Sequence, residues 1–600
     1  NLSAKNATFV SDNTSALNSY DKQTQSCAIT MYKGKLTNAD FSGSSVIATG
    51  VNDSTSADST VFIGANFGGS TLENVNFGNT VIEVSASNGL GSGDIISRGI
   101  NLADTQLNNG SKSGYAFCAN NAKIYTSAEN SNGSAKAYGI ILSNKSGDGI
   151  ILADGVEIYT ETNARDSAYS SGIQVIGNDM VNASFVGAKI NVSSVSESET
   201  AAANGFFTDE SIINSNFANA EFTATAISSG VNNRASSCGF VMRREGIIDS
   251  DFSGAVFKTS ATGKDGSEAV SSAFYLDWNI TNTDFRNATF YATSESQERS
   301  GAHGFYINYS GIELSNVDFS GASFTAISTG TSGGAQGFYC FYSGYGTGTT
   351  FKNVNFQNVS VKVIENSKDV SDTKGMVFNG AILDRVDFRG SNVSDYCVDT
   401  ASSLTNVLYA DGRIRNFSAS NSATSIDIIA HRPKAGQSAV SAKIYYDNAV
   451  VSNAKLKLLE DAQLEVLNGK SLTLSENGGI HIVVNPDSGI VPISFSEGAS
   501  FVLDGGYIIV DITQLPQSEF GFTIMEWTDD CNMASLADLE KDFNITLCLN
   551  DKPYTGQWDF YLEENSLEIR FSTVVPEPAE TAAILAFAAL LAAAFLRHRK

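Results

Sequence analysis

The chain has 600 residues, a formal net charge of −26, 53 glycines and only 7 prolines. The acidic balance excludes the basic stripe of a free nucleic-acid-binding protein, and the many glycines with few prolines indicate an all-β chain with many turns. The seven cysteines contain no Cys-x-x-Cys pair, which argues against a zinc site of the usual spacing.

The N-terminal part of the chain contains an imperfect version of the repeat described below. It begins Asn1-Leu2-Ser3 without Met and without an apolar leader, so we expect either a removed signal peptide or a fragment. Residues 1–30 are expected to form an imperfect coil that caps the N-terminal end. A repeat of large apolar residues at every fifth position is clearest at residues 36–82, and its spacing becomes irregular at residues 83–180.

From residue 183 onward a short phrase returns with a nearly fixed period. Ser250-Asp-Phe-Ser-Gly-Ala-Val-Phe257 is one copy, and the others resemble it. The central phenylalanines recur every 32 to 37 residues, at Phe185, Phe217, Phe252, Phe285, Phe319, Phe356 and Phe388. A period of this size is the signature of a repeat architecture.

Within each copy a large apolar residue recurs every five positions, as at Ile247, Phe252 and Phe257. A step of five fits neither a helix nor a long strand. It predicts a chain that turns a corner every five residues and winds into a square coil. The apolar residue and the small residue two places before it then point inward, and the Asp or Asn points outward.

This pattern resembles the pentapeptide-repeat family, whose unit is small-(Asp/Asn)-(Leu/Phe)-x-x. The resemblance implies a right-handed parallel β-solenoid, which we assign to residues 1–424. A plain coil of four units needs 20 residues, so a period of about 33 leaves roughly 13 residues in each turn. We expect these residues to leave the coil as hairpins or lateral loops, for example at 291–306 and 325–339.

Glycine-aromatic pairs mark the end of each expected loop. They are predicted to stack as an aromatic ladder at Gly205-Phe206, Gly239-Phe240, Gly304-Phe305 and Gly337-Phe338. Filling of the core is the interpretation that we favour for these rings. The alternative is a row of exposed rings that stack on sugars.

The polar residues before the central phenylalanines should form an outward ladder: Asp251, Asp284, Asp318, Asn355 and Asp387. Carboxylates on adjacent coils, about 5 Å apart, could bind calcium or act as an acid/base pair. We favour a ladder that satisfies turn amides. No calcium-repeat phrase is present, so we predict no cofactor and no metal site, with calcium as an unsupported alternative.

Catalytic motifs are sparse. The four histidines are His303 in a predicted loop, His431 beside Arg432-Pro433, His481 in an alternating strand, and His598 in the tail. No Gly-x-Ser-x-Gly, His-Glu-x-x-His or P-loop phrase is present. A polysaccharide lyase would need basic residues near the acidic ladder, and the main candidates are Arg243, Arg244, Arg286 and Arg299.

Residues 425–573 have denser, alternating strand-like runs, such as Gly479-Ile-His-Ile-Val-Val484. Strand-turn phrases here resemble the ends of autotransporter passenger domains. We predict a C-terminal β-rich domain that caps the open end of the solenoid, with one short helix at Ala534–Phe543. Cys531 and Cys548 could form a disulfide in an oxidising compartment, although buried single cysteines are the interpretation that we favour.

The last segment, residues 574–600, differs from the rest of the chain. Residues 581–596 carry no charge and are mostly Ala and Leu, so we predict a transmembrane helix there, slightly under the usual length of about 20 residues. The basic residues that follow are expected to stay in the cytoplasm: Arg597, Arg599 and Lys600.

This tail resembles the PEP-CTERM sorting signal. Pro576-Glu577-Pro578 matches the defining tripeptide, and the Ala-rich helix and basic end match the remainder. The resemblance implies an exported Gram-negative protein that is processed by an exosortase. The protein would be tethered to the inner membrane by its C-terminal helix and then released to the cell surface or the extracellular space.

Together the repeat and the tail favour a non-enzymatic structural or adhesive β-solenoid of the cell surface or extracellular matrix. Its expected partners are an exosortase-type enzyme, the membrane, and exopolysaccharide or host glycans. The alternative is a polysaccharide lyase or hydrolase on a parallel β-helix. DNA mimicry by an acidic solenoid is a third hypothesis, and the export tail argues against it.

Overall fold

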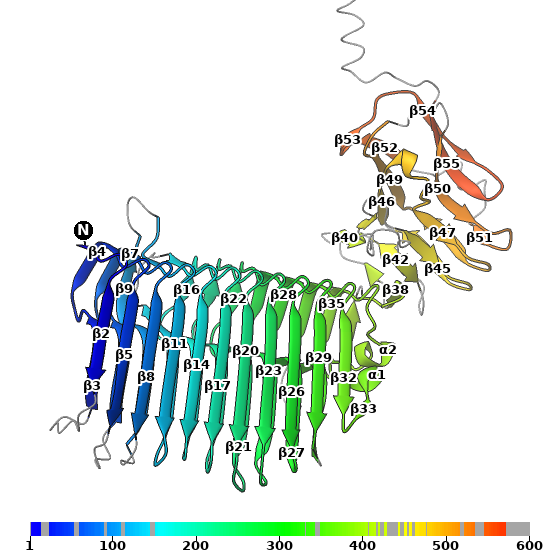
Figure 1. Cartoon of the computed structure of the whole chain (residues 1–600). Helices are drawn as coiled ribbons and strands as arrows, with labels where there is room; N and C mark the ends of the chain where they lie inside the picture. Colours follow the sequence, from blue (N-terminus) through cyan, green and yellow to red (C-terminus); the bar gives the residue numbers. More distant parts are fainter. Residues whose placement is uncertain are drawn as a thin grey trace, which may run out of the picture. The chain divides into compact units, whose positions relative to one another are not determined.

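A computed structural model gives the structure of the chain (Figure 1), and it divides into two compact units, Asn1–Leu404 and Thr405–Lys600. The domain boundary predicted from the sequence, between residues 424 and 425, lies within the second unit. The structure describes residues 2–13, 23–52, 59–88, 93–109, 114–144, 150–330, 332–341, 348–405, 407–415, 418–419, 425–428, 442–444, 449–452, 455–458, 463–475, 477–515, 521–533 and 545–571. Each unit is described separately below.

The first unit is a parallel β-solenoid in which each regular turn supplies three strands. One such turn consists of β22 (Ile247–Ile248), β23 (Val256–Gly263) and β24 (Glu268–Leu276). Each of the three pairs in parallel with its counterpart in the next turn: β25 (Ile280–Asp284), β26 (Thr289–Ser296) and β27 (Arg299–Ile307). All-β architecture and a parallel solenoid are therefore confirmed.

The strands equivalent to β23 form what we call the first long sheet, whose members run side by side from blue to green in Figure 1. In addition to β23 and β26 they are β2 (Thr8–Asn13), β5 (Ser45–Asn52), β8 (Val81–Asn88), β11 (Lys123–Asn130), β14 (Glu157–Ala164), β17 (Lys189–Ser196), β20 (Glu221–Ser228), β29 (Ser323–Thr329), β32 (Ser360–Glu365) and the antiparallel β33 (Lys368–Asp369).

The strands equivalent to β24 form the second long sheet. In addition to β24 and β27 they are β3 (Gln23–Thr30), β6 (Ser59–Asn66), β9 (Ile95–Asn108), β12 (Ala135–Asn144), β15 (Ala168–Val175), β18 (Ala201–Thr208), β21 (Arg234–Met242), β30 (Ser332–Cys340) and β34 (Met376–Val377). Two short helices, α1 (Ser371–Lys374) and α2 (Asp395–Val398), follow near the end of the unit.

The five-residue phrases form the third side, which we call the corner ladder. In addition to β22 and β25 it contains β1 (Leu2–Ser3), β4 (Lys35–Asp40), β7 (Thr71–Asn76), β10 (Phe117–Cys118), β13 (Ile151–Leu152), β16 (Met180–Val181), β19 (Ile212–Ile213), β28 (Glu313–Asp318), β31 (Thr350–Asn355) and β35 (Ile382–Asp387). The corner strands are short because the chain turns after every few residues.

The prediction of lateral loops and hairpins was wrong. Residues 291–306 lie in β26 and β27, and residues 325–339 lie mainly in β29 and β30, so both segments are sides of the coil. Along β26 the residues alternate between outward and buried, with Phe290, Ala292, Ser294 and Ser296 facing inward. Because these inward residues are mostly small, the two long sheets can pack closely on each other. Each turn therefore consists of three strands, and the predicted square coil with four short sides is not formed.

From residue 185 onward, the core of the first unit contains three parallel rows of phenylalanine. Phe206 and Phe240 stack with ring centroids 4.5 Å apart, and Phe217 and Phe252 stack at 4.7 Å in the corner row. The two rows meet edge to face, since Phe240 and Phe252 lie 5.4 Å apart at 89°. The third row begins at Phe222, and all of these rings are fully buried. The predicted aromatic ladder is confirmed, and its role is to fill the core.

A glycine precedes most of the inner rings, where adjacent coils approach closely, although Ala273 stands before Phe274. A Cβ atom on Gly205 would lie 2.5 Å from the carbonyl oxygen of Gly239, and one on Gly304 would lie 2.4 Å from that of Gly337. A glycine at this position therefore lets the backbones of neighbouring turns pair without a steric clash.

The second unit also consists of parallel ladders, so the predicted β-rich domain is itself a short solenoid. One ladder contains β41 (Ala442–Ile444), β44 (Leu464–Val466), β47 (Ile493–Phe495) and β50 (Phe522–Trp527). A second contains β39 (Ser418–Ala419), β42 (Ala449–Ser452), β45 (Ser471–Ser475), β48 (Ser500–Asp504) and β51 (Asn532–Met533).

The third ladder of this unit contains β40 (Ser425–Ile428), β43 (Lys455–Leu458), β46 (Gly479–Val484), β49 (Tyr507–Ile512) and β52 (Ile545–Leu549). Antiparallel pairs end the unit, formed by β53 (Lys552–Pro553), β54 (Trp558–Leu562) and β55 (Ser566–Phe571). Remaining elements are β36 (Ser403–Thr405), β37 (Val407–Leu408), β38 (Arg413–Arg415) and the 3₁₀ helix Pro486–Ser488.

Several predictions fall on residues that the structure does not describe. These are His431, the helix at Ala534–Phe543 and the whole tail, including the sorting tripeptide and the membrane segment 581–596. A search of the described residues finds no helix with the length and hydropathy needed to span a membrane. Cys531 and Cys548 are both free thiols, so the possible disulfide between them is not formed.

Candidate functional site

The acidic ladder serves the turns of the coil. A side-chain oxygen of Asp251 accepts a hydrogen bond from the backbone N–H of Ser253 at 2.8 Å, and Asp318 accepts one from Ser320 at 2.8 Å. The same bond recurs at Asp284, Asn355 and Asp387. An Asp or Asn that bonds the amide two residues on forms an Asx turn. Our favoured interpretation of this ladder is confirmed.

The basic lyase candidates do not gather along this ladder. Arg286 donates to the carboxylate of Asp284 at 2.5–2.7 Å, next to its own Asx turn. Arg299 lies at the start of β27 and forms an ion pair with Glu268 at 3.8 Å. Arg243 follows β21 and lies over the ring of Phe207, and Arg244 is exposed beside it. The four arginines are thus spread over different sides of the coil.

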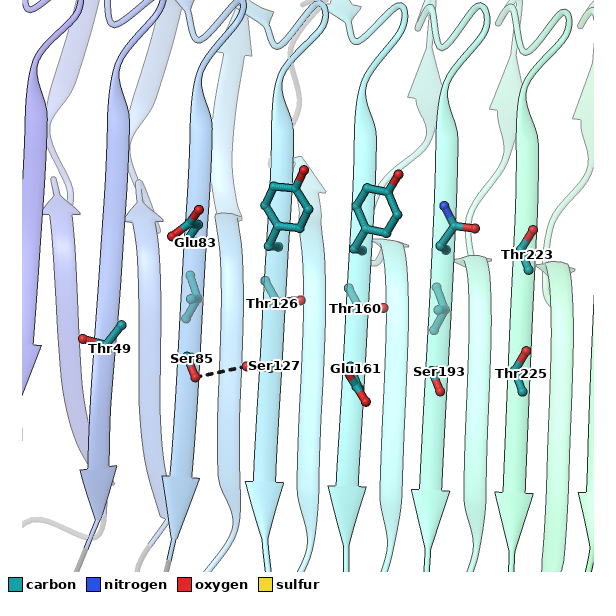
Figure 2. Close-up of a pocket in the computed structure, with 15 residues that line it drawn as sticks. Thr49, Glu83, Ser85, Thr126, Ser127, Thr160, Glu161, Ser193, Thr223 and Thr225 are labelled. Carbon is teal, nitrogen blue, oxygen red and sulfur yellow. Dashed lines mark hydrogen bonds between the residues drawn. The ribbon is translucent and has the colours of Figure 1, made fainter.

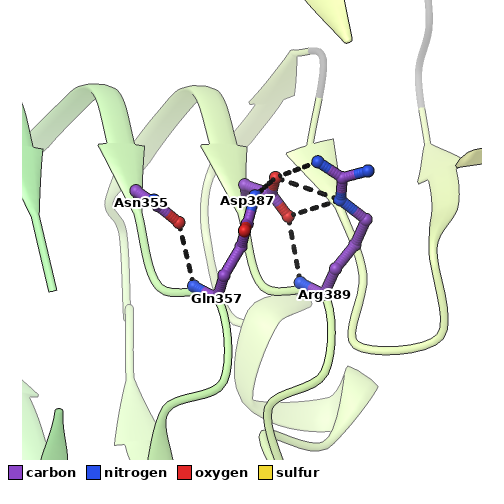
Figure 3. Close-up of polar contacts among 4 residues, drawn as sticks. All are labelled: Asn355, Gln357, Asp387 and Arg389. Atoms are coloured by element: carbon purple, nitrogen blue, oxygen red, sulfur yellow. Dashed lines mark hydrogen bonds and ion pairs between the residues drawn. The ribbon is translucent and has the colours of Figure 1, made fainter. Parts of the chain in front are cut away.

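The last rung of the ladder differs from the others, as Figure 3 shows. Arg389 is fully buried, and its guanidinium donates to Asp387 at 2.7–3.1 Å through two nitrogens. Gln357 on the preceding turn donates to the same carboxylate at 2.5 Å. Sequence patterns gave no sign of this pair, because Asp284 and Arg286 occupy the same two positions of the repeat and are more exposed. The ion pair between Arg389 and Asp387 stabilises this turn of the coil.

A groove of about 640 Å³ lies on the outer face of the first long sheet, across β5, β8, β11, β14, β17 and β20. The parallel register aligns one row of outward side chains across five strands: Glu83, Tyr125, Tyr159, Asn191 and Thr223. A second row, two residues further along each strand, is formed by Thr49, Ser85, Ser127, Glu161, Ser193 and Thr225 (Figure 2).

Two tyrosines form the apolar part of the groove. The rings of Tyr125 and Tyr159 stack with centroids 5.2 Å apart and an interplanar angle of 10°. Their exposed fractions are 37% and 38%, in contrast to the buried phenylalanine rows. Tyr keeps a polar hydroxyl beside its apolar ring, so such a pair offers both stacking and hydrogen bonding.

Hydroxyl and carboxylate groups flank the rings. Ser127 donates to Ser85 at 3.1 Å. The exposed carboxylate of Glu83 lies beside Tyr125 in the same row, and that of Glu161 lies two residues beyond Tyr159 on β14. At the edge of the groove Lys123 forms an ion pair with Glu157 at 3.2 Å. The rungs repeat at the strand spacing of about 4.8 Å, so the groove presents a periodic polar surface with an aromatic patch.

The groove presents both carboxylate and hydroxyl groups to solvent. Glu83 and Glu161 are separated by two strand spacings and two residues, which places their Cα atoms roughly 12 Å apart. What the groove offers is rings for stacking, with hydroxyls and carboxylates that can pair with the hydroxyls of a ligand.

Two histidines can be compared with the sequence predictions. His303 lies in β27, not in a loop, and its ring stacks on Tyr306 with centroids 4.6 Å apart. Burial lowers the pKa of His303 to about 4, and a hydrogen bond with Gln336 opposes that effect. His481 lies in β46, the alternating strand predicted for it.

Sequence reasoning missed the tyrosine pair. The available signal was the phrase Ile-Tyr-Thr, which occurs at 124–126 and again at 158–160 within the irregular coils. A comparison of the sequence with protein-family models and with curated proteins gave no match. The resemblances of the repeat and the tail therefore depend on their residues alone.

Proposed function

We propose that this chain is an exported, non-enzymatic β-solenoid of the cell surface or extracellular matrix that binds polysaccharide along its first long sheet. The observation that carries the proposal is the exposed, stacked pair Tyr125 and Tyr159 within a groove of hydroxyl and carboxylate groups. Sugars present an apolar face and a rim of hydroxyls, and this groove has a complementary group for each.

The shape of the groove favours a polymer. It crosses six strands of one flat sheet, so a ligand that follows it contacts equivalent positions on successive coils. Exopolysaccharide or host glycans meet this description. The lyase or hydrolase alternative loses support, since the acidic ladder is engaged in Asx turns and its arginine candidates are dispersed.

Export is a separate part of the proposal and depends on the tail. Pro576-Glu577-Pro578, the apolar segment 581–596 and the basic end support a sorting signal that an exosortase would recognise. Removal of residues 574–600 is expected to move the protein from the membrane fraction to the soluble fraction of an expressing bacterium. Fractionation of cells with both versions tests this, and equal membrane association of the two would contradict it.

The groove is tested by binding to polysaccharide. The double variant Tyr125→Ala/Tyr159→Ala removes both rings, and the loss of stacking and apolar burial should cost about 2 kcal/mol or more, which is about 30-fold in affinity. Affinity electrophoresis in gels that contain bacterial, plant or mucin polysaccharides measures the change.

Tyr291→Ala is the matched control, because Tyr291 stands in the same outward row, four strands away from Tyr159 and outside the groove. The control variant should be retarded as strongly as the wild type. Equal retardation of the double variant and the wild type would rule out this groove as the binding site.

A further inference from the structure

A second group of polar side chains lies in the second unit, on its third ladder. His481 comes from β46, Asp511 from the neighbouring strand β49, and Asp551 from the turn after β52. The three residues are 30 and 40 positions apart in the sequence, and the solenoid brings them onto adjacent coils. One nitrogen of the imidazole and one oxygen of each carboxylate all lie within 4.8 Å of one another.

A tight hairpin holds Asp551 in this cluster. Asn550 and Asp551 join β52 to β53 and have φ values of 51° and 62°. Two successive residues with positive φ are typical of a type I′ turn, in which Asn and Asp are favoured. The backbone N–H of Asp551 donates to both carboxylate oxygens of Asp511, at 2.9 and 3.1 Å. Asp511 thereby fixes the turn and brings the second carboxylate beside its own.

The imidazole of His481 is buried and lacks hydrogen-bond partners. Its exposed fraction is 6%, and neither ring nitrogen has a partner among the described residues. A buried polar atom without a partner costs about 1–3 kcal/mol, so native structures rarely contain one without a ligand to satisfy it. Nε2 of His481 lies 3.8 Å from Oδ2 of Asp511, which is too long for a hydrogen bond.

Burial lowers the pKa of His481, and Lys455 and Lys457 on the neighbouring strand lower it further, while Asp511 and Asp551 oppose them. Neutral imidazole is the form that ligates metals.

We propose that His481, Asp511 and Asp551 bind a divalent transition-metal ion, with Zn²⁺ as the best-fitting probe. Two ligand atoms about 2.1 Å from a tetrahedral metal lie about 3.4 Å apart. The observed 3.8 Å between Nε2 and Oδ2 thus needs only a small closure. A cation between them would also offset the repulsion of two adjacent carboxylates.

The donor set selects the class of metal. One imidazole nitrogen with two carboxylate oxygens suits zinc and its first-row neighbours, whereas calcium takes six to eight oxygen ligands and no imidazole. Three protein ligands leave a fourth position for water. The ion would connect two neighbouring coils and the hairpin that follows, and so stabilise the last turns of the second unit.

The test uses the full chain without a histidine tag. Equilibrium dialysis against Zn²⁺, with metal counted by mass spectrometry, should give one bound equivalent, and Co²⁺ loading should give visible absorption bands. His481→Gln and Asp551→Asn should each weaken binding at least about 10-fold, as expected when a ligand is lost. A ten-fold excess of Ca²⁺ should leave bound zinc unchanged.

The matched control is His303→Gln, which removes a partly buried histidine of the first unit and should retain the full zinc equivalent. Asp551 lies at an exposed turn where Asn is also favoured, so its variant tests the site even if the His481 variant fails to fold. Binding of less than half an equivalent by the wild type would overturn the proposal, as would undiminished binding by Asp551→Asn or displacement of zinc by calcium.

Discussion

Replacing Asp387 by Asn is expected to lower the free energy of unfolding by about 3–5 kcal/mol. Arg389 is fully buried and its charge is balanced by Asp387 alone among the described residues (Figure 3). Removing one partner of a buried ion pair leaves an uncompensated buried charge, which is among the most destabilising single changes. Asn keeps the Asx turn, since Asn355 occupies the same rung on the preceding coil.

Asp284→Asn provides a matched control, because Asp284 and Arg286 occupy the same two positions of the repeat. The Arg286 side chain is 56% exposed, so its ion pair should contribute at most about 1 kcal/mol. Urea denaturation followed by circular dichroism compares the two variants. Equal losses of stability in both would show that burial of Arg389 has no energetic consequence.

Replacing Phe319 by Ala is expected to cost about 3–5 kcal/mol, the usual effect of removing a buried aromatic ring. Its ring stacks between Phe285 at 5.0 Å and Phe356 at 5.1 Å, and Phe305 meets it edge to face at 5.5 Å. Because each coil is stabilised chiefly by its neighbours, the cavity should weaken both interfaces and split the unfolding transition.

The control for this variant is Thr325→Ala, one residue beyond the buried Phe324 on the outward face of β29. It should change stability by less than about 0.5 kcal/mol, as surface substitutions usually do. Differential scanning calorimetry of both variants gives the comparison. A single transition at the wild-type temperature for Phe319→Ala would contradict the role given to the stacked rows.

The repeat and its core could be predicted because their signals are strong. Phe252 and its equivalents recur at a nearly fixed period, and a large ring that returns every five positions beside a small residue is typical of a tightly wound coil. The two long sheets were mistaken for loops. Their inward residues, such as Ala292 and Ser294, are small because the sheets pack closely, so the strands lack the apolar alternation that normally marks them.

The two candidate sites depend on register, which the sequence alone did not provide. Tyr125 and Tyr159 are adjacent only if the irregular coils align residue for residue, as the ladder between β11 and β14 shows. His481 and Asp511 likewise meet diagonally across neighbouring coils. The Asx turns, in contrast, involve residues two positions apart, and so were predictable from local chemistry.

The most direct test of the central claim is the size distribution of polysaccharide recovered from the protein after prolonged incubation. Polysaccharides that the wild-type chain retains in affinity gels would be incubated with it, eluted and sized by chromatography. A non-enzymatic binding groove predicts that chains are retained and recovered at their original length, and that Tyr125→Ala/Tyr159→Ala retains far less. Shortened chains, or no retention of any polysaccharide, would contradict this account.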